Sequence, residues 1–60
     1  MTEKRMRAIL IAEYGNRKYR IQKDGYIYVY GKMPNTNKDG WYLFGFVGDW
    51  QTEQRIEEIG

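Results

Sequence analysis

Three turn dipeptides divide this 60-residue chain into short runs, and they constrain its fold more than any other feature. Gly15-Asn16, Asp24-Gly25 and Asp39-Gly40 are residue pairs that tolerate the positive φ angles of tight turns. The runs beside the last two pairs are rich in Tyr, Ile, Val, Phe and Trp, which fit a pleated, half-buried surface. The pattern therefore predicts β-strands at residues 17–23, 26–30 and 41–47.

The first run, Met6–Tyr14, is open to two interpretations. Four of its residues would line one side of a helix, namely Met6, Ile9, Leu10 and Glu13. The Gly15-Asn16 pair that follows favours a hairpin instead, because both residues tolerate a positive φ. We expect a further strand near residues 6–14.

The last third of the chain indicates a loop and then a helix. Residues 31–40, GKMPNTNKDG, are dense in turn-forming residues and predict a loop without secondary structure. Asp49 is a suitable N-cap for a helix near residues 50–59, and Ile56 and Ile59 lie on one face of that helix. Ten residues form a marginal helix in water, so this helix must dock on the rest of the chain.

These elements predict a single domain over residues 1–60. Its expected class is α+β, with a small three- or four-stranded antiparallel sheet and one short C-terminal α-helix. A chain of this size buries only about 60% of the surface that its unfolded form exposes. Trp41, Leu43 and Val47 would occupy one face of the last strand and Tyr42, Phe44 and Phe46 the other, so both faces are apolar. A homodimer or a protein target would supply the missing cover.

The composition excludes several kinds of chemistry. The chain contains no Cys, His or Ser, which removes disulfides, thiolate or imidazole metal sites and the usual nucleophiles. Its closest carboxylates fall on the predicted helix, where solvated charge is the simpler interpretation. The longest wholly apolar run, Ala8–Ala12, is far below the roughly 20 residues of a membrane span. We expect a cytoplasmic protein that is not an enzyme, binds no cofactor or metal and does not enter a membrane.

Charge is distributed unevenly along the chain. Residues 1–23 hold seven Lys and Arg against two Glu, a formal charge of +5, whereas residues 24–60 carry −3. A surface polarised in this way would attract polyanions on one side. The alternative is that these are ordinary solubilising charges.

The hairpin around Asp24-Gly25 determines which side chains share a face. A two-residue loop would pair Lys23 with Tyr26, whereas a three-residue loop with Gly25 in a left-handed bulge pairs Gln22 with Tyr26. We prefer the second, because it separates an apolar face from a polar one more cleanly. The apolar face then holds Tyr19, Ile21, Ile27 and Val29, and the other holds Lys18, Arg20, Gln22, Tyr26, Tyr28 and Tyr30.

This second set is our candidate nucleic-acid-binding site. Lys and Arg neutralise phosphates, while Tyr can stack on a base or donate its hydroxyl to a phosphate. Two other interpretations stay open. The tyrosines could form a structural cross-strand ladder, or they could pack against a protein partner.

The segment from Lys18 to Ile59 also resembles a known family. KYRIQKDGYIYVYGK followed by WYLFGFVGDWQTEQRIEEI is similar to the amino-terminal arm-type DNA-binding domain of lambda-type tyrosine recombinases, or integrases. The resemblance implies a three-stranded sheet backed by a C-terminal helix, with the sheet face in the DNA major groove. It implies DNA-facing roles for Lys18, Arg20, Gln22, Tyr26 and Tyr28. The loop before the last strand is longer than in that family, the helix is acidic, and the catalytic domains are absent.

Two functions follow as expectations. The first is a non-catalytic DNA- or nucleic-acid-binding accessory protein of phage or mobile-element type, with duplex DNA as its partner. The alternative is a small inhibitor or modulator that docks on a protein target through its aromatic surface.

Overall fold

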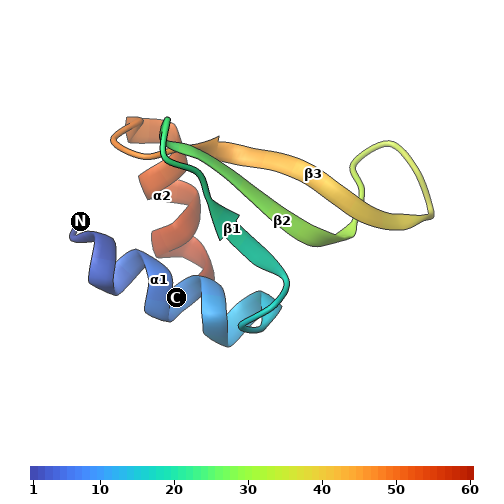
Figure 1. The fold of residues 1–60 in the computed structure, drawn as a ribbon, viewed down its shortest axis with the longest axis horizontal. Coiled ribbons are helices and arrows are strands. Elements are labelled where there is room, and N and C mark those ends of the chain that lie inside the picture. The colour runs from blue at the N-terminus through green and yellow to red at the C-terminus, as the bar shows by residue number, and fades with distance from the viewer.

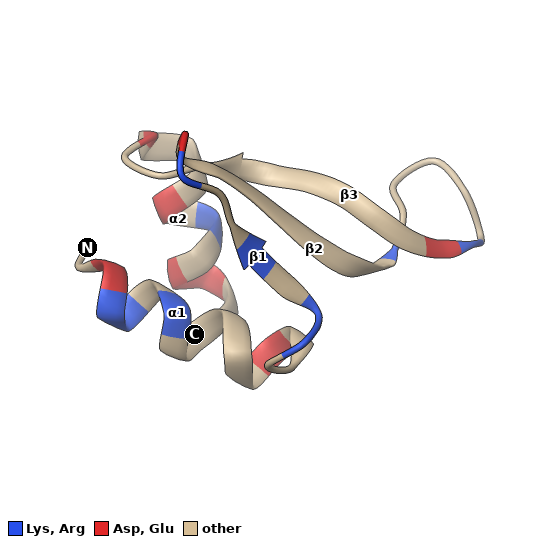
Figure 2. Ribbon diagram, viewed as in Figure 1, with Lys and Arg blue, Asp and Glu red and all other residues tan.

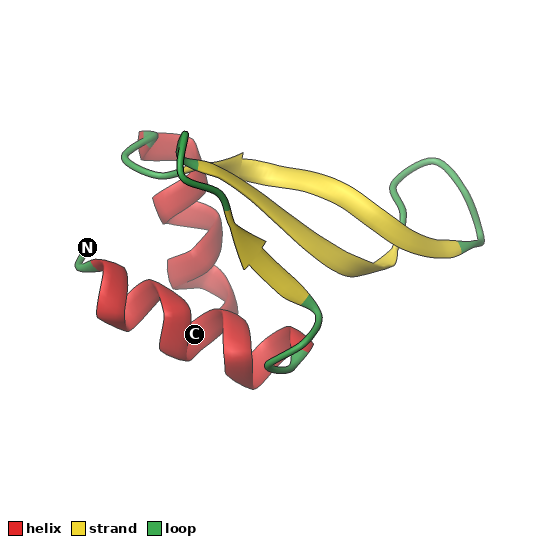
Figure 3. Ribbon diagram, in the orientation of Figure 1, coloured by secondary structure: helices red, strands yellow, loops and turns green.

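The computed structural model describes all of residues 1–60 as two helices and one sheet (Figure 1). The elements are α1 (Glu3–Tyr14), β1 (Tyr19–Ile21), β2 (Tyr26–Lys32), β3 (Asp39–Phe46) and α2 (Trp50–Ile59). The strands form one antiparallel sheet in the order β1-β2-β3, and both helices pack on the same face of it (Figure 3). The expected α+β class is confirmed with three strands, but the expectation of a single helix is wrong.

The prediction of a strand near residues 6–14 is wrong, because this segment belongs to α1. The Thr2 side chain caps the helix by accepting a hydrogen bond from the Arg5 backbone N–H at 3.1 Å. Met6 and Leu10, one turn apart, are both buried in the core. Gly15 ends the helix with φ +106°, and its N–H donates to the Ile11 carbonyl. The Gly-Asn pair is therefore a helix-terminating signal here, which uses the same positive φ as a hairpin turn.

The other predicted elements shift by a few residues. β1 is shorter than residues 17–23, whereas β2 and β3 continue into the predicted loop. Gly31 pairs with Gly40 and Lys32 with Asp39, so the loop covers only residues 33–38. The helix near residues 50–59 is confirmed as α2. Asp49 caps it by accepting a hydrogen bond from the Thr52 backbone N–H at 3.0 Å.

The register predicted for the first hairpin is confirmed. Ile21 lies opposite Ile27, and the Gln22 N–H donates to the Tyr26 carbonyl at 2.8 Å. Gly25 has φ +99°, as the left-handed bulge requires. The Asp24 carboxylate holds the turn by accepting the Tyr26 N–H at 3.2 Å.

A bulge in β3 corrects the predicted faces of that strand. Tyr28 pairs with Leu43 but Ile27 pairs with Gly45, so Phe44 is an extra residue on the β3 side. The bulge resets the alternation. Trp41, Leu43 and Phe46 are exposed on the outer side, whereas Tyr42, Phe44 and Val47 pack on or in the core. Phe46 and Val47 thus occupy the opposite faces to those expected.

The core lies between the helices and one face of the sheet. Its six buried residues are Met6, Leu10, Ile27, Val29, Phe44 and Ile56. Thr52 joins the layers, since its hydroxyl accepts the Phe46 N–H and donates to the Asp49 carboxylate, both at 3.1 Å. The β2–β3 hairpin extends beyond the helices (Figure 1). The opposite face of the sheet has no helix over it.

Candidate nucleic-acid interface

Where the three strands lie side by side, the uncovered face of the sheet carries nine side chains in a regular grid. We call it the outer sheet face, and it consists of Lys18, Arg20, Gln22, Tyr26, Tyr28, Tyr30, Trp41, Leu43 and Phe46. All six residues of the site predicted from the sequence lie on it. The three residues from β3, namely Trp41, Leu43 and Phe46, were not part of that predicted site and are added by the structure.

Strand register arranges these residues in three rows across the sheet. Arg20, Tyr28 and Leu43 form the middle row. The outer rows are Lys18 with Tyr30 and Trp41, and Gln22 with Tyr26 and Phe46. Within these three rows, β1 and its flanks are polar or cationic, β2 presents tyrosines and β3 presents apolar side chains. One further pair, Lys32 of β2 and Asp39 of β3, follows on the same side of the sheet toward the end of the hairpin.

Neighbouring aromatic rings hold one another in place on this face. Tyr30 meets Trp41 edge to face, with ring centres 5.7 Å apart. Tyr26 meets Phe46 in the same manner at 5.0 Å. Such pairs contribute about 0.5–1.5 kcal/mol beyond their buried area. They still leave Trp41 44% and Phe46 41% exposed, so these two rings are fixed but accessible.

The two cations of the face lie against aromatic rings and have no carboxylate partner. The Lys18 Nζ is 5.8 Å from the centre of the Tyr30 ring. The Arg20 guanidinium carbon is 5.5 Å from the centre of the Trp41 ring. The ion pairs of the molecule lie elsewhere, at the N-terminus and on the helices. Both cations are therefore available to a phosphate.

A shallow hollow lies within the outer sheet face. Arg20, Gln22, Tyr28 and Trp41 line it, and its volume is about 190 Å³. These four residues come from all three strands, so the hollow exists only when the sheet is assembled.

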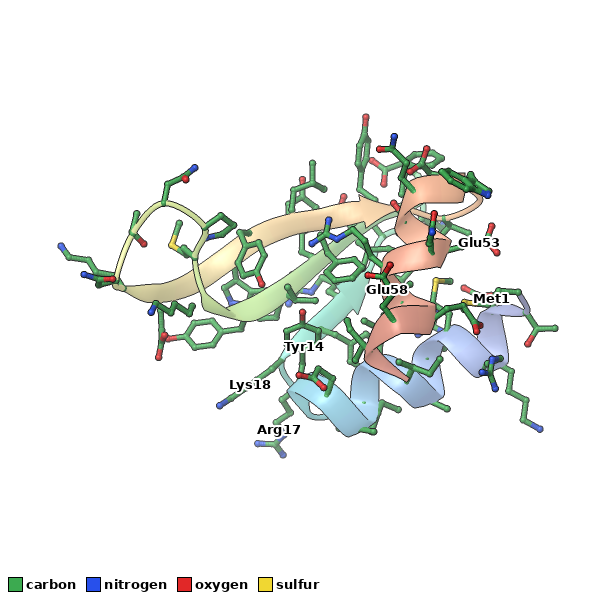
Figure 4. All side chains as sticks on the ribbon, turned by 180° about the vertical axis from the view of Figure 1, so that it is seen from behind. Met1, Tyr14, Arg17, Lys18, Glu53 and Glu58 are labelled. Atoms are coloured by element: carbon green, nitrogen blue, oxygen red, sulfur yellow. The ribbon has the colours of Figure 1, made fainter.

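The net formal charge differs between the sheet and the rest of the chain, although charges of both signs occur in each part (Figure 2). Residues 17–46, which form the sheet and its turns, hold six Lys and Arg against two Asp, a charge of +4. The remaining residues, which include both helices, carry −2. The basic N-terminal half expected from the sequence does not form one surface, because Arg5 pairs with Glu57 on α2 at 3.1 Å and Arg7 with Glu3 at 3.2 Å. Arg17 and Lys18 instead project outward from the α1–β1 connection (Figure 4).

The helix-covered face has a second polar cluster, which is structural. Burial, followed by hydrogen bonding with the Tyr42 side chain, raises the pKa of Tyr14 to about 12. Arg55 donates to the Phe44 carbonyl at 2.9 Å and lies 4.5 Å from the centre of the Phe44 ring. These contacts attach the end of α1 and the middle of α2 to β3.

Because side chains alternate between the two faces of a strand, Trp41 and Leu43 share a face. Locating either of them on the outer sheet face would therefore have located the other. Phe46 could not be found in this way, because the bulge at Phe44 reverses its side.

The structure gathers no three carboxylates that could hold a metal ion. Neither helix has the length and apolar character needed to cross a bilayer. No protein-family model, curated protein sequence or solved structure matches this chain.

Proposed function

We propose that this protein is a non-catalytic nucleic-acid-binding protein and that the outer sheet face is its contact surface. The observation that carries the proposal is the position of Lys18 and Arg20. Both cations lack a carboxylate partner and lie against aromatic rings, the half-buried Tyr30 and the exposed Trp41, on a face that no helix covers. Sequence-tolerant nucleic-acid binding has two elements. Cations replace the counterions of the phosphates, and aromatic rings stack on the bases.

The charge of the two layers supports the same proposal. A layer of +4 attracts a polyanion, while the acidic residues of α2 lie on the far side of the sheet (Figure 2). Such a dipolar distribution would orient the protein with its outer sheet face toward the nucleic acid. The resemblance of residues 18–59 to the integrase arm-type domain implies contact through the same face.

A protein partner is the second candidate, favoured by the β3 side of the face. Trp41, Leu43 and Phe46 are apolar and more than two-fifths exposed. Large exposed aromatic side chains are enriched at protein interfaces. A protein target or a second copy of the chain would bury them without the participation of Lys18.

Salt dependence separates the two functions. Fluorescence anisotropy with labelled DNA should show an affinity that falls linearly with salt on logarithmic axes, since bound phosphates release counterions. Size-exclusion chromatography over a range of concentrations measures self-association of the same sample. Absence of binding to single-stranded and duplex DNA and RNA at low salt would overturn the nucleic-acid proposal and leave the protein partner.

A further inference from the structure

We infer that the hollow lined by Arg20, Gln22, Tyr28 and Trp41 receives one unpaired nucleobase, so that the protein prefers single-stranded nucleic acid to duplex. The inference rests on the proposed function and deepens it. It differs from the duplex partner expected from the sequence, and it depends on the β3 residues that only the structure adds to the face.

The size of the hollow favours a single planar group. Its volume of about 190 Å³ lies below the roughly 300–1,000 Å³ of pockets for drug-sized ligands. Its walls are also of two kinds. Trp41 and Tyr28 supply aromatic surface, whereas Arg20 and Gln22 supply hydrogen-bonding groups.

These groups match the chemistry of a free base. An aromatic ring or a planar guanidinium stacks on the face of a base, and that face is covered by neighbouring base pairs inside a duplex. The Gln22 amide offers both a donor and an acceptor, and the Arg20 guanidinium offers several donors. A base that has left its stack can use the stacking surface and the hydrogen-bonding groups together.

The distribution of cations across the sheet also favours one strand of nucleic acid. A sheet that lies in the major groove of a duplex has a phosphate backbone on each side of it. The groove between these two backbones is about 12 Å wide. Strands in a sheet are about 4.8 Å apart, so β1 and β3 are separated by about 10 Å. On the outer sheet face, Lys18 and Arg20 are anchored on the β1 side, and the Arg20 guanidinium reaches across β2 to the Trp41 ring. β3 contributes Asp39 and apolar side chains to this side of the sheet and no cation, and Lys32 belongs to β2. A face without a cation on one edge strand suits a single phosphate backbone.

The two tryptophans provide a direct test. Trp41 lies near the start of β3, whereas Trp50 opens α2 beyond its other end and is 72% exposed. In the variant W50F, Trp41 is the only tryptophan and reports stacking in the hollow by fluorescence quenching. In the reciprocal variant W41F, Trp50 is the reporter and its emission should not change on binding. Circular dichroism verifies that each variant is folded.

The probes are a short oligothymidylate, the same strand with abasic sites in place of its bases, and a mixed-sequence duplex of equal length. We expect the oligothymidylate to quench Trp41 and to bind W50F more tightly than the duplex does. The abasic strand should bind roughly 5- to 150-fold more weakly, the effect of losing one stacked base. In W41A, the ratio between the intact and abasic strands should fall toward one.

The outcomes distinguish this inference from the function on which it rests. Equal affinity for intact and abasic strands, or a duplex bound as tightly as the single strand, would overturn the base pocket and leave nucleic-acid binding intact. Unchanged Trp41 emission in a saturated complex would also overturn it. No binding to any of the three probes at low salt would instead remove the proposed function.

Discussion

The guanidinium carbon of Arg20 lies 5.5 Å from the centre of the Trp41 ring, although the two residues belong to the two outer strands of the sheet. The Arg20 side chain therefore spans the central strand β2. This position brings a cation from the edge of the outer sheet face to its apolar side. Arg20 is consequently a candidate contact for both a phosphate and a base.

Removing the two cations of the face should weaken nucleic-acid binding without unfolding the protein. For K18A together with R20A, we expect the slope of log affinity against log salt to become shallower by about 1.4 on a single strand, the effect of two lost phosphate contacts. The melting temperature should change little, since both residues are exposed and a cation–π contact at such a site contributes about 0.5–1 kcal/mol. The control is K4A with R5A, the same charge change on α1. If the control lowers the slope equally, the attraction comes from net charge and not from this face.

A methyl group at Gly45 should destabilise the junction between β3 and α2. A Cβ at this position would overlap the hydroxyl of Thr52, a buried residue that holds the Phe46 N–H and the Asp49 carboxylate. We expect G45A to lower the free energy of unfolding by about 1–3 kcal/mol, measured by urea denaturation. G31A is the matched control, because Gly31 also lies in a strand, has no positive φ, and its Cβ position comes no nearer than 4.0 Å to another residue, at the Tyr14 ring.

A double-mutant cycle identifies the cause of that loss. If the overlap with Thr52 is responsible, G45A should cost less in a T52A background than in the wild type. Strictly additive effects of the two changes would show that Gly45 is required for another reason.

Docking of α2 should depend on Ile56, whose side chain is 0% exposed between the helix and the sheet. We expect I56A to lower the free energy of unfolding by about 2–5 kcal/mol, since it removes buried methyl groups and leaves a cavity. I11A is the matched control, because Ile11 is 41% exposed on α1. A similar melting temperature for I56A and the wild type would show that α2 contributes little to the stability of the fold.

Stability at alkaline pH should depend on Tyr14. Its pKa in the folded protein is about 12, above the ordinary tyrosine value of 10.0, so the folded state holds this proton more tightly than the unfolded state. The resulting stabilisation is fully present below pH 10 and is lost as the pH rises toward about 12. In Y14F, the free energy of unfolding should fall less steeply across this window than in the wild type. Parallel curves for the two proteins would show that Tyr14 does not titrate in this way.

Local chemistry in the sequence was sufficient for the hairpin and for α2. The Asp24 carboxylate and the positive φ of Gly25 define a turn within four residues, and the turn sets the register of β1 and β2. Register then determines which side chains share a face, so the six predicted site residues fall together on the outer sheet face. Asp49 caps α2 in the same local way.

Only the tertiary structure decided α1, the faces of β3 and the distribution of charge. The pattern of residues 6–14 suits a helix or a strand, and burial of Met6 and Leu10 against Ile27 and Val29 selects the helix. The bulge at Phe44 places its ring in the core and turns Phe46 outward, which alternation within one strand does not reveal. Arg5 of α1 pairs with Glu57 of α2 only because the two helices pack side by side. Each of these features depends on contacts between segments distant in the chain, whereas a turn or a cap is satisfied by its immediate neighbours.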